Sequence, residues 1–376
     1  MAGIYIHIPF CKQRCIYCDF HFSTSFNSYR AEMIEAICVE IIERKKYLDN
    51  QEIKTIYFGG GTPSLLLDYE LKSILDTIHS NFVVKKSLEI TLEVNPDDIK
   101  QENLIIWRKN GVNRLSIGIQ SLKQSDLDWM NRSHKVEDSF ASILLAQKYG
   151  FDNINVDLIY GLPNLSMEDW VSHLNFIIQN DLITHLSAYC LTVENNTILN
   201  DRVIKRKINL PNEDVQSDQF LKLIEMIEKS DFEQYEISNF SRSGFESKHN
   251  SNYWKGFSYL GVGPSAHSFN GESRSWNLSN NKIYIKKIKE NNLGYNETEK
   301  LSKLDQFNER ILIGLRTIYG VNLNELSKLN KLTKEFQLAL SEFKDKKWIE
   351  EDVGVLTLTK EGKLRADYIA SGLFIS

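Results

Sequence analysis

The chain has 376 residues, of which 42% are hydrophobic and 25% charged, and its formal net charge is −5. This is the composition of an ordinary globular protein, long enough for a large core and about two domains. The lack of a basic segment excludes a nucleic-acid partner, and the lack of an apolar run of about 18 residues excludes a transmembrane segment. The N-terminus carries no signal-peptide pattern, so we expect a cytoplasmic protein.

The first two thirds of the chain alternate short β-branched segments with helical patterns. Strands are expected at residues 4–8, 55–58, 88–94, 114–119, 153–159 and 184–191. Helices are expected near residues 28–48, 69–81, 101–110, 125–130, 137–149, 167–179 and 213–229. Repeated β–α units predict parallel strands with right-handed crossovers. The expected fold class is therefore α/β, with a partial (β/α)6 barrel over residues 1–240 and functional groups at the C-terminal strand ends.

The alternation stops at about residue 240. Residues 241–300, rich in glycine and aromatic residues, are expected to form a connecting region. Residues 301–376 predict a helix from Asp305, helices over 322–329 and 333–346, and a hairpin over 348–358. Helices followed by a small hairpin predict a winged-helix-like accessory domain. Because this segment has no basic face, a lid or a partner-docking role is favoured over DNA binding.

Three cysteines follow the first expected strand. Cys11, Cys15 and Cys18 have the spacing C-x3-C-x2-C, one thiolate short of a closed zinc or iron–sulfur site. A [4Fe–4S] cube held by three thiolates leaves one iron open to a small molecule. The triplet therefore predicts an iron–sulfur cluster with an open coordination position.

Three other interpretations of the triplet remain open. The cysteines could be small core residues on one helix face, although Pro9 and the β-prone residues 16–20 argue against a helix there. A zinc site could take His7 or His21 as its fourth ligand. A disulfide is the third alternative, but nothing in the chain suggests export. The remaining Cys38 and Cys190 lie in periodic apolar segments and are expected to be core residues.

Residues 5–11 (YIHIPFC) and 17–20 (YCDF) resemble one branch of the radical S-adenosylmethionine (SAM) superfamily. This branch holds the oxygen-independent coproporphyrinogen III oxidases and the haem chaperones of the HemW type. The resemblance implies a [4Fe–4S] cluster on the three cysteines, with SAM bound to the open iron. It also implies one-electron cleavage of SAM to a 5′-deoxyadenosyl radical, and an electron donor such as flavodoxin or ferredoxin.

Residues 59–63 (GGGTP) follow the second expected strand, where glycines let a backbone approach a ligand closely. A plain tight turn is the alternative, and the spacing is not that of a dinucleotide-binding loop. Polar residues end the other strands. Each of them, taken alone, could bind a ligand or could simply be a loop residue that is hydrogen-bonded within the protein. The resemblance implies that SAM is contacted by Tyr5, Gly60, Gly61, Thr62, Glu93, Gln120, Arg132, Asp157 and Ala188.

Two features separate the oxidases from the chaperones. The oxidases carry a further cysteine two residues after the third cluster ligand, where this chain has Phe20. Residues 249–254 (HNSNYW) match the H-N-x-x-Y-W signature associated with haem in the HemW branch. The imidazole of His249 could serve as an axial ligand, with Tyr253 and Trp254 against the porphyrin. The alternative is a structural histidine, and in either case we expect His249 outside the SAM pocket proper.

The expected function is that of a haem chaperone, which binds the cluster, SAM and haem and transfers haem to an acceptor protein such as a membrane-associated respiratory enzyme. The alternative is an oxygen-independent coproporphyrinogen III oxidase that forms protoporphyrinogen IX. A third reading is a radical SAM enzyme with another substrate. No residue is assigned a catalytic role, and haem attachment by coordination or by a covalent bond stays open.

Overall fold

The computed structural model describes residues 1–291 and 293–376, and its first half is built on six parallel strands. These are β1 (Ala2–Ile8), β2 (Ile53–Gly60), β3 (Val84–Val94), β4 (Arg114–Gln120), β5 (Ile154–Tyr160) and β6 (His185–Cys190), which pair in chain order. Most of their residues are buried because helices cover one face and the strands curve around the other. The six strands expected from the sequence are confirmed.

The connections between these strands are helical. They contain α1 (Arg30–Glu43), α2 (Asp68–Asn81), α3 (Gln101–Lys109), α4 (Gln124–Met130), α5 (Val136–Lys148) and α6 (Met167–Gln179), and α7 (Ile198–Ile204) and α8 (Glu213–Ile227) follow β6. Short 3-10 helices occupy Asn27–Tyr29, Pro63–Leu65, Pro96–Asp98 and Leu293–Tyr295. Every expected helix of this half is present. The helix expected over residues 28–48 ends earlier, at Glu43, and α7 was not expected.

Both edges of the sheet are extended by strands that the sequence did not predict. On one side β8 (Asn239–Arg242) runs antiparallel to β6 and pairs with β7 (Phe232–Glu236). On the other side β9 (Ser258–Val262) runs parallel to β1, followed outward by β10 (His267–Phe269), β11 (Ser273–Asn277) and β12 (Asn296–Lys300). The expected connecting region thus belongs largely to the main sheet, together with α9 (Lys248–Trp254) and α10 (Asn281–Lys289). Strands this short and polar give no clear two-residue period.

The C-terminal segment has a hydrophobic core of its own, which includes Phe307, Ile311, Phe336 and Ile369. It contains α11 (Lys303–Gly314), β13 (Val321–Asn322), α12 (Leu323–Leu329), α13 (Lys334–Asp345), β14 (Ile349–Asp352), β15 (Val355–Leu358), α14 (Lys360–Lys363) and α15 (Ala366–Gly372). The expected hairpin is present as β14 and β15, while α14 and α15 were not expected.

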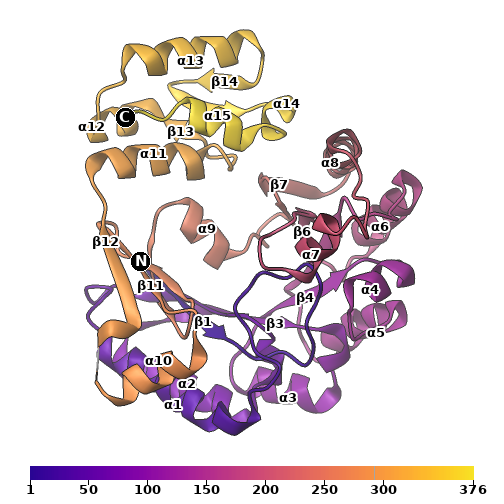
Figure 1. Ribbon diagram of the computed structural model, residues 1–376, viewed down its shortest axis with the longest axis vertical. Coiled ribbons are helices and arrows are strands. Elements are labelled where there is room, and N and C mark those ends of the chain that lie inside the picture. The colour runs from indigo at the N-terminus through magenta and orange to yellow at the C-terminus, as the bar shows by residue number, and fades with distance from the viewer. Residues whose placement is uncertain (292) are drawn as a thin grey trace.

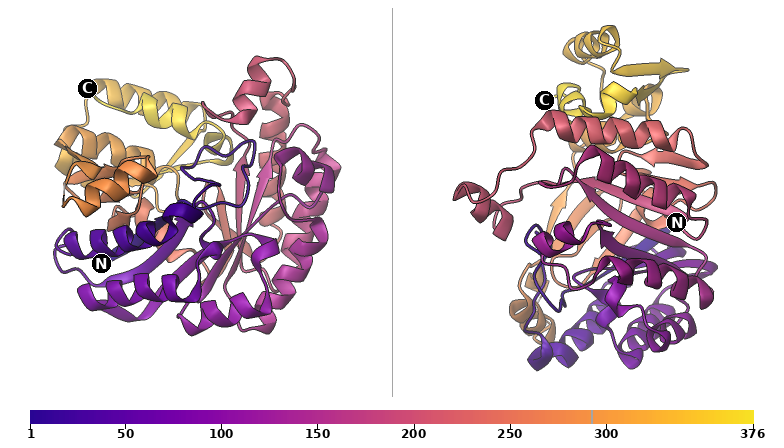
Figure 2. Two further views of the ribbon diagram at one scale, coloured as in Figure 1. Left: turned by 60° about the horizontal axis from the view of Figure 1, so that its bottom comes forward. Right: turned by 90° about the vertical axis from the view of Figure 1, so that its right-hand side faces the viewer.

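The C-terminal segment lies beside the barrel rather than apart from it. Figure 2 shows the helices of the first half as an arc around the strands, with the C-terminal helices on the side where the arc is open. In Figure 1, α9 lies between the barrel strands and this segment. None of the helices in residues 1–291 and 293–376 combines the length and apolar character needed to cross a bilayer.

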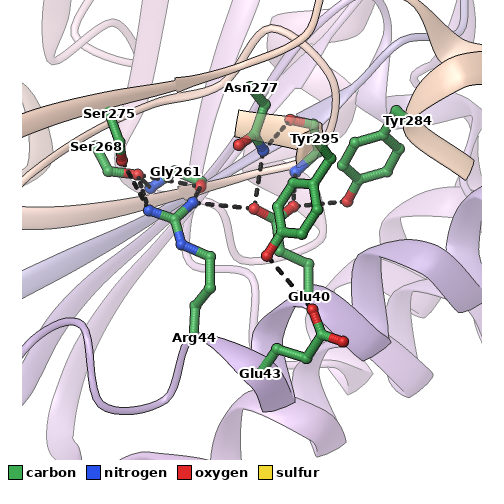
Figure 3. A network of polar contacts seen from close by, with 10 residues as sticks. Glu40, Glu43, Arg44, Gly261, Ser268, Ser275, Asn277, Tyr284 and Tyr295 are labelled. Atoms are coloured by element: carbon green, nitrogen blue, oxygen red, sulfur yellow. Dashed lines mark hydrogen bonds and ion pairs between the residues drawn. The ribbon is translucent and has the colours of Figure 1, made fainter. Parts of the chain in front are cut away.

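A buried ion pair on α1 ties the barrel to its unexpected edge (Figure 3). Arg44 Nη1 lies 3.0 Å from Glu40 Oε1, one helical turn away, and both side chains are buried. The Glu40 carboxylate also accepts hydrogen bonds from the Gly263 N–H (2.8 Å), the Tyr284 hydroxyl (2.6 Å) and the Asn277 amide (2.8 Å).

Arg44 makes the matching set of contacts as a donor. Its guanidinium donates to the Gly261 carbonyl (3.0 Å), the Ser268 hydroxyl (3.0 Å) and the Ser275 hydroxyl (2.9 Å). These partners lie on or next to β9, β10 and β11, so one ion pair fixes three strands and α10 against α1. Removing one partner of a buried charge pair destabilises a protein far more than removing one partner of an exposed pair, because the other charge is left buried without its counter-ion.

We expect Arg44→Met to lower the free energy of unfolding by about 3 kcal/mol, because Glu40 keeps its neutral donors but loses its buried counter-ion. Lys72→Met is the matched control, since Lys72 and Asp76 form an exposed pair at the same helical spacing. The free energy of unfolding of Lys72→Met should fall by less than about 0.5 kcal/mol. Urea denaturation measures both, and equal losses would contradict the assigned role of the buried pair.

Candidate functional site

A cavity of about 820 Å³ lies at the C-terminal ends of the parallel strands. Strand β4 shows how it is lined: Arg114, Ser116, Gly118 and Gln120 all reach it, because every second side chain of a strand points to the same face. Parts of the C-terminal segment also border the cavity, at Arg316 and over residues 363–368. The cavity is therefore bordered by the barrel and the C-terminal segment together.

The cavity collects most of the residues that the sequence singled out. Those that line it are Cys11, Cys15, Cys18, Gly60, Gly61, Thr62, Glu93, Gln120, Arg132 and Asp157. Tyr5, Ala188 and His249 are not among the lining residues. Tyr5 lies one layer behind, with its ring stacked on Tyr57 at 6.1 Å between centroids. Ala188 is buried in β6.

The cysteine loop between β1 and α1 is not helical, which removes the interpretation of three core cysteines on one helix face. Phe10 pairs with Ser23 at the base of the loop, and the Ile16 N–H donates to the Met130 carbonyl at 3.2 Å. All five cysteines are free thiols, so the disulfide interpretation is also wrong. The loop is held by backbone contacts that leave its three thiols facing one cavity.

Two side-chain hydrogen bonds reach the sulfurs: Thr62 Oγ1 lies 3.4 Å from Cys11 Sγ, and Arg132 Nη1 lies 3.5 Å from Cys15 Sγ. Burial raises the pKa of Cys11 to about 11 and that of Cys18 to about 12. These thiols therefore keep their protons at neutral pH unless a cation binds them. Iron is such a cation, since a coordinating thiol is deprotonated outright.

The arrangement of donors does not favour a single metal ion. Within residues 1–291 and 293–376, no group of three or more His, Cys, Asp or Glu side chains converges as a mononuclear site requires. His7 Nε2 is bonded to the His21 carbonyl (2.8 Å) and its Nδ1 to the Tyr5 hydroxyl (3.2 Å), while His21 Nε2 is bonded to Asn281 Oδ1 (2.7 Å). Three of the four ring nitrogens of these two histidines are therefore already hydrogen-bonded. A cube carries its irons at separate corners and takes one thiolate at each, which fits spaced thiols.

The glycine loop after β2 packs directly on the start of the cysteine loop. The Gly61 N–H donates to the Ile8 carbonyl at 2.9 Å, and the Thr62 N–H to the Phe10 carbonyl at 2.6 Å. A Cβ atom on Gly61 would lie 2.6 Å from the Phe10 carbonyl oxygen. At Gly60 a Cβ would lie 2.6 Å from the His7 ring, and φ is +106°. Glycine is needed here for close backbone approach, so this segment is more than a plain turn.

Glu93 ends β3 with its carboxylate already oriented. It accepts hydrogen bonds from the Tyr57 hydroxyl (2.8 Å) and from the Gly60 N–H (3.2 Å). Burial raises the pKa of Glu93 to about 7, and it also raises the pKa of Asp157. Asp157 is held by Asn155 Nδ2 at 2.7 Å. Both carboxyls are placed to meet the hydroxyl or ammonium groups of a ligand.

The end of β4 is distorted toward the cavity. The pairing of β4 with β5 shifts register between Ile117 and Gln120, and Gln120 has φ +70°, which is uncommon outside glycine. Arg132 Nη2 donates to the Gly118 carbonyl (2.7 Å) and to Asn95 Oδ1 (2.6 Å). The sequence interpretation missed Gly118 and Asn95, although a glycine inside a strand signals a close approach.

His249 lies in α9, beneath the cavity and 1% exposed. Its Nδ1 is bonded to the Thr55 hydroxyl at 2.8 Å and its Nε2 to the Tyr253 hydroxyl at 2.7 Å. The ring stacks on Tyr57 at 5.1 Å between centroids, and Tyr57 in turn holds Glu93. In this packing His249 supports the floor of the cavity, and both ring nitrogens are already hydrogen-bonded.

The geometry agrees with the comparisons to known proteins. Residues 5–177 match the Radical SAM superfamily. Over 369 residues the chain is 34% identical to the haem chaperone HemW of Bacillus subtilis, with 97% of each chain covered. The chain belongs to the HemW family. Another family relative, the mitochondrial radical S-adenosyl methionine domain-containing protein 1 of Danio rerio, is 32% identical over 85% of this chain and 74% of that protein.

A solved structure confirms the fold expected for this HemW-family chain. The coproporphyrinogen III oxidase HemN of Escherichia coli superposes with a TM-score of 0.84 at 23% identity, over 99% of this chain and 90% of that one. Both are α/β, with a partial barrel and a C-terminal domain. Membership of the radical SAM superfamily implies a [4Fe–4S] cluster and SAM, and the three unpaired thiols facing one cavity fit the cluster. When bound, the cluster supplies one-electron reduction of SAM.

We expect anaerobic reconstitution to give about four irons and four sulfides per chain, as for a [4Fe–4S] cluster. Cys15→Ala should abolish this iron content, because a cube cannot be held by the two remaining thiolates. Cys38→Ala is the matched control, since Cys38 is a free thiol on α1, away from the cavity. Iron and sulfide analysis measures both, and full iron in the Cys15 variant would remove this residue from the site.

The buried carboxyl of Glu93 predicts a pH dependence of stability. Its pKa rises from 4.5 to about 7 on folding, so the folded chain binds this proton more tightly than the unfolded chain. The resulting stability is complete below pH about 4.5 and is lost as pH rises through about 7. Relative to Glu93→Gln, the native chain should lose on the order of 3 kcal/mol between pH 4.5 and pH 8. Urea denaturation of both proteins without SAM at the two pH values tests this. An equal change in the free energy of unfolding of the native chain and of Glu93→Gln would contradict it.

Proposed function

We propose that this chain is a haem chaperone that binds a [4Fe–4S] cluster, SAM and haem, and passes haem to an acceptor protein. The observation that carries the proposal is the 34% identity to HemW of Bacillus subtilis, which extends over 97% of both chains. Phe20 supports it as well. This residue borders the cavity at the position where, by the resemblance, the oxidases carry a further cysteine.

The chain's own residues divide the proposed work. Cys11, Cys15 and Cys18 hold the cluster. The SAM contacts proposed from the resemblance are Tyr5, Gly60, Gly61, Thr62, Glu93, Gln120, Arg132, Asp157 and Ala188, of which Tyr5 and Ala188 act from behind the cavity wall. An electron donor such as flavodoxin or ferredoxin, and an acceptor such as a membrane-associated respiratory enzyme, complete the proposal. Five free thiols favour a reducing compartment, the cytoplasm.

His249 as a haem ligand requires a change in the packing of α9. Both of its ring nitrogens are bonded, to Thr55 and Tyr253, and burial lowers its pKa to about 3, so the ring is neutral. A neutral imidazole is the form that ligates iron. We propose that coordination follows release of one of these two hydrogen bonds, with α9 moving away from Tyr57.

Haem titration followed by the Soret band tests this role. His249→Ala should lose the band while keeping its iron–sulfur content. Tyr253→Phe frees Nε2 without removing the imidazole and should bind haem at least as tightly as the native chain. Thr55→Val is the matched variant for Nδ1. If His249→Ala and the native chain titrate alike, His249 is not the ligand.

A transfer assay tests the function itself. Haem-loaded protein, with its cluster and SAM, should lose haem to an acceptor that lacks it, and the Cys15→Ala variant should transfer less. The same preparation should leave coproporphyrinogen III unchanged under anaerobic conditions with SAM and a reductant. Accumulation of protoporphyrinogen IX would instead make the chain an oxidase, the function named for the structurally similar HemN.

A further inference from the structure

Three large aromatic side chains are exposed around the same cavity. Phe20 is 66% exposed on the cysteine loop, Tyr189 is 44% exposed near the end of β6, and Tyr368 is 60% exposed on α15. All three line the cavity. A single exposed aromatic residue is ordinary on a protein surface, but three from separate parts of the chain at one opening mark a binding surface.

Smaller apolar side chains lie around the same cavity as these rings. Leu191, Ile237 and Leu364 also line the cavity. Leu364 comes from the C-terminal segment yet packs against the hydrophobic core of the barrel, so the two parts of the chain are in contact here. We call this set of six residues the mouth surface. The adjoining cavity of about 820 Å³ is within the range of volumes of sites for large organic ligands.

Two cations stand beside the mouth surface without acidic partners. Lys363 Nζ donates to the amide oxygen of Gln234 at 2.6 Å, and Arg365 Nη1 to the Glu361 carbonyl at 3.2 Å. Both residues line the cavity. Within residues 1–291 and 293–376, neither forms an ion pair with a carboxylate. The carboxylate of the neighbouring Asp367 pairs instead with Arg316, at 3.4 Å.

We propose that the mouth surface is the docking site for haem, with the flat macrocycle against Phe20, Tyr189 and Tyr368 and the propionates on Lys363 and Arg365. The inference rests on the proposed chaperone function and extends it. Aromatic rings stack on an apolar macrocycle, and unpaired cations suit its two carboxylates. His249 is closed off beneath the cavity floor, so haem must be recognised elsewhere before this residue can bind iron.

The test uses full-length protein and two probes, haem and metal-free protoporphyrin IX, because the porphyrin has the macrocycle and propionates but no iron to coordinate. Tyr368→Ala should weaken the binding of both probes at least tenfold, and so should the double variant Lys363→Gln with Arg365→Gln. Since Tyr368 also contacts Trp348 and Phe343, circular dichroism must show a native fold, and the double variant provides an independent arm. His249→Ala should retain porphyrin affinity.

Matched controls lie away from the cavity. Tyr69→Ala removes an aromatic ring of similar exposure on α2, and Lys282→Gln removes a cation on α10. Both control variants should bind the two probes as tightly as the native chain does. In a separate test of the propionates, protoporphyrin dimethyl ester should bind the native chain at least tenfold more weakly than the free acid. If Tyr368→Ala and the double variant bind haem and protoporphyrin IX as tightly as the control variants do, the proposed docking site is wrong, while the chaperone function still stands. Failure of the native chain to bind haem saturably would overturn the chaperone function and the docking site together.

Discussion

The backbone contact between the glycine loop and the cysteine loop is the constraint on which the site depends. Gly61 and Thr62 donate to the carbonyls of Ile8 and Phe10, and the Thr62 hydroxyl lies against the sulfur of Cys11. Only glycine fits at position 61, because a Cβ atom there would lie less than 3.0 Å from two carbonyl oxygens, those of Ile8 and Phe10. One short stretch of glycine thus fixes the thiols relative to the strand ends that carry the proposed SAM contacts.

Polar groups beneath the cavity are arranged in layers that follow from the register of the strands. Tyr57 and Thr91 pair across β2 and β3, and Thr91 pairs with Arg114 on β4, so these side chains share one level of the barrel. Glu93 stands one step higher and is held from below by Tyr57, which itself rests on His249. Because each layer supports the next, a histidine far along the sequence influences the carboxyl group that lines the cavity.

The C-terminal segment supplies part of the wall of the cavity. Its core is separate from that of the barrel, so it contributes through its surface rather than by sharing an interior. Leu364 packs against the barrel, while residues 363–368 border the cavity together with the cysteine loop. The cavity is therefore bordered by two parts of the chain that lie more than three hundred residues apart in sequence.

The sequence by itself determined the six parallel strands, their helices and the cysteine triplet, because hydrophobic period and ligand spacing are local properties. It also placed Glu93, Gln120 and Asp157 at one edge, since parallel strands end together. Only the tertiary structure decided that β9, β10 and β11 join the main sheet, since these strands are held by the distant Glu40–Arg44 pair rather than specified by their own pattern. Likewise, the burial of His249 and the approach of Lys363 to the cavity depend on contacts between residues more than a hundred positions apart, which no local pattern encodes.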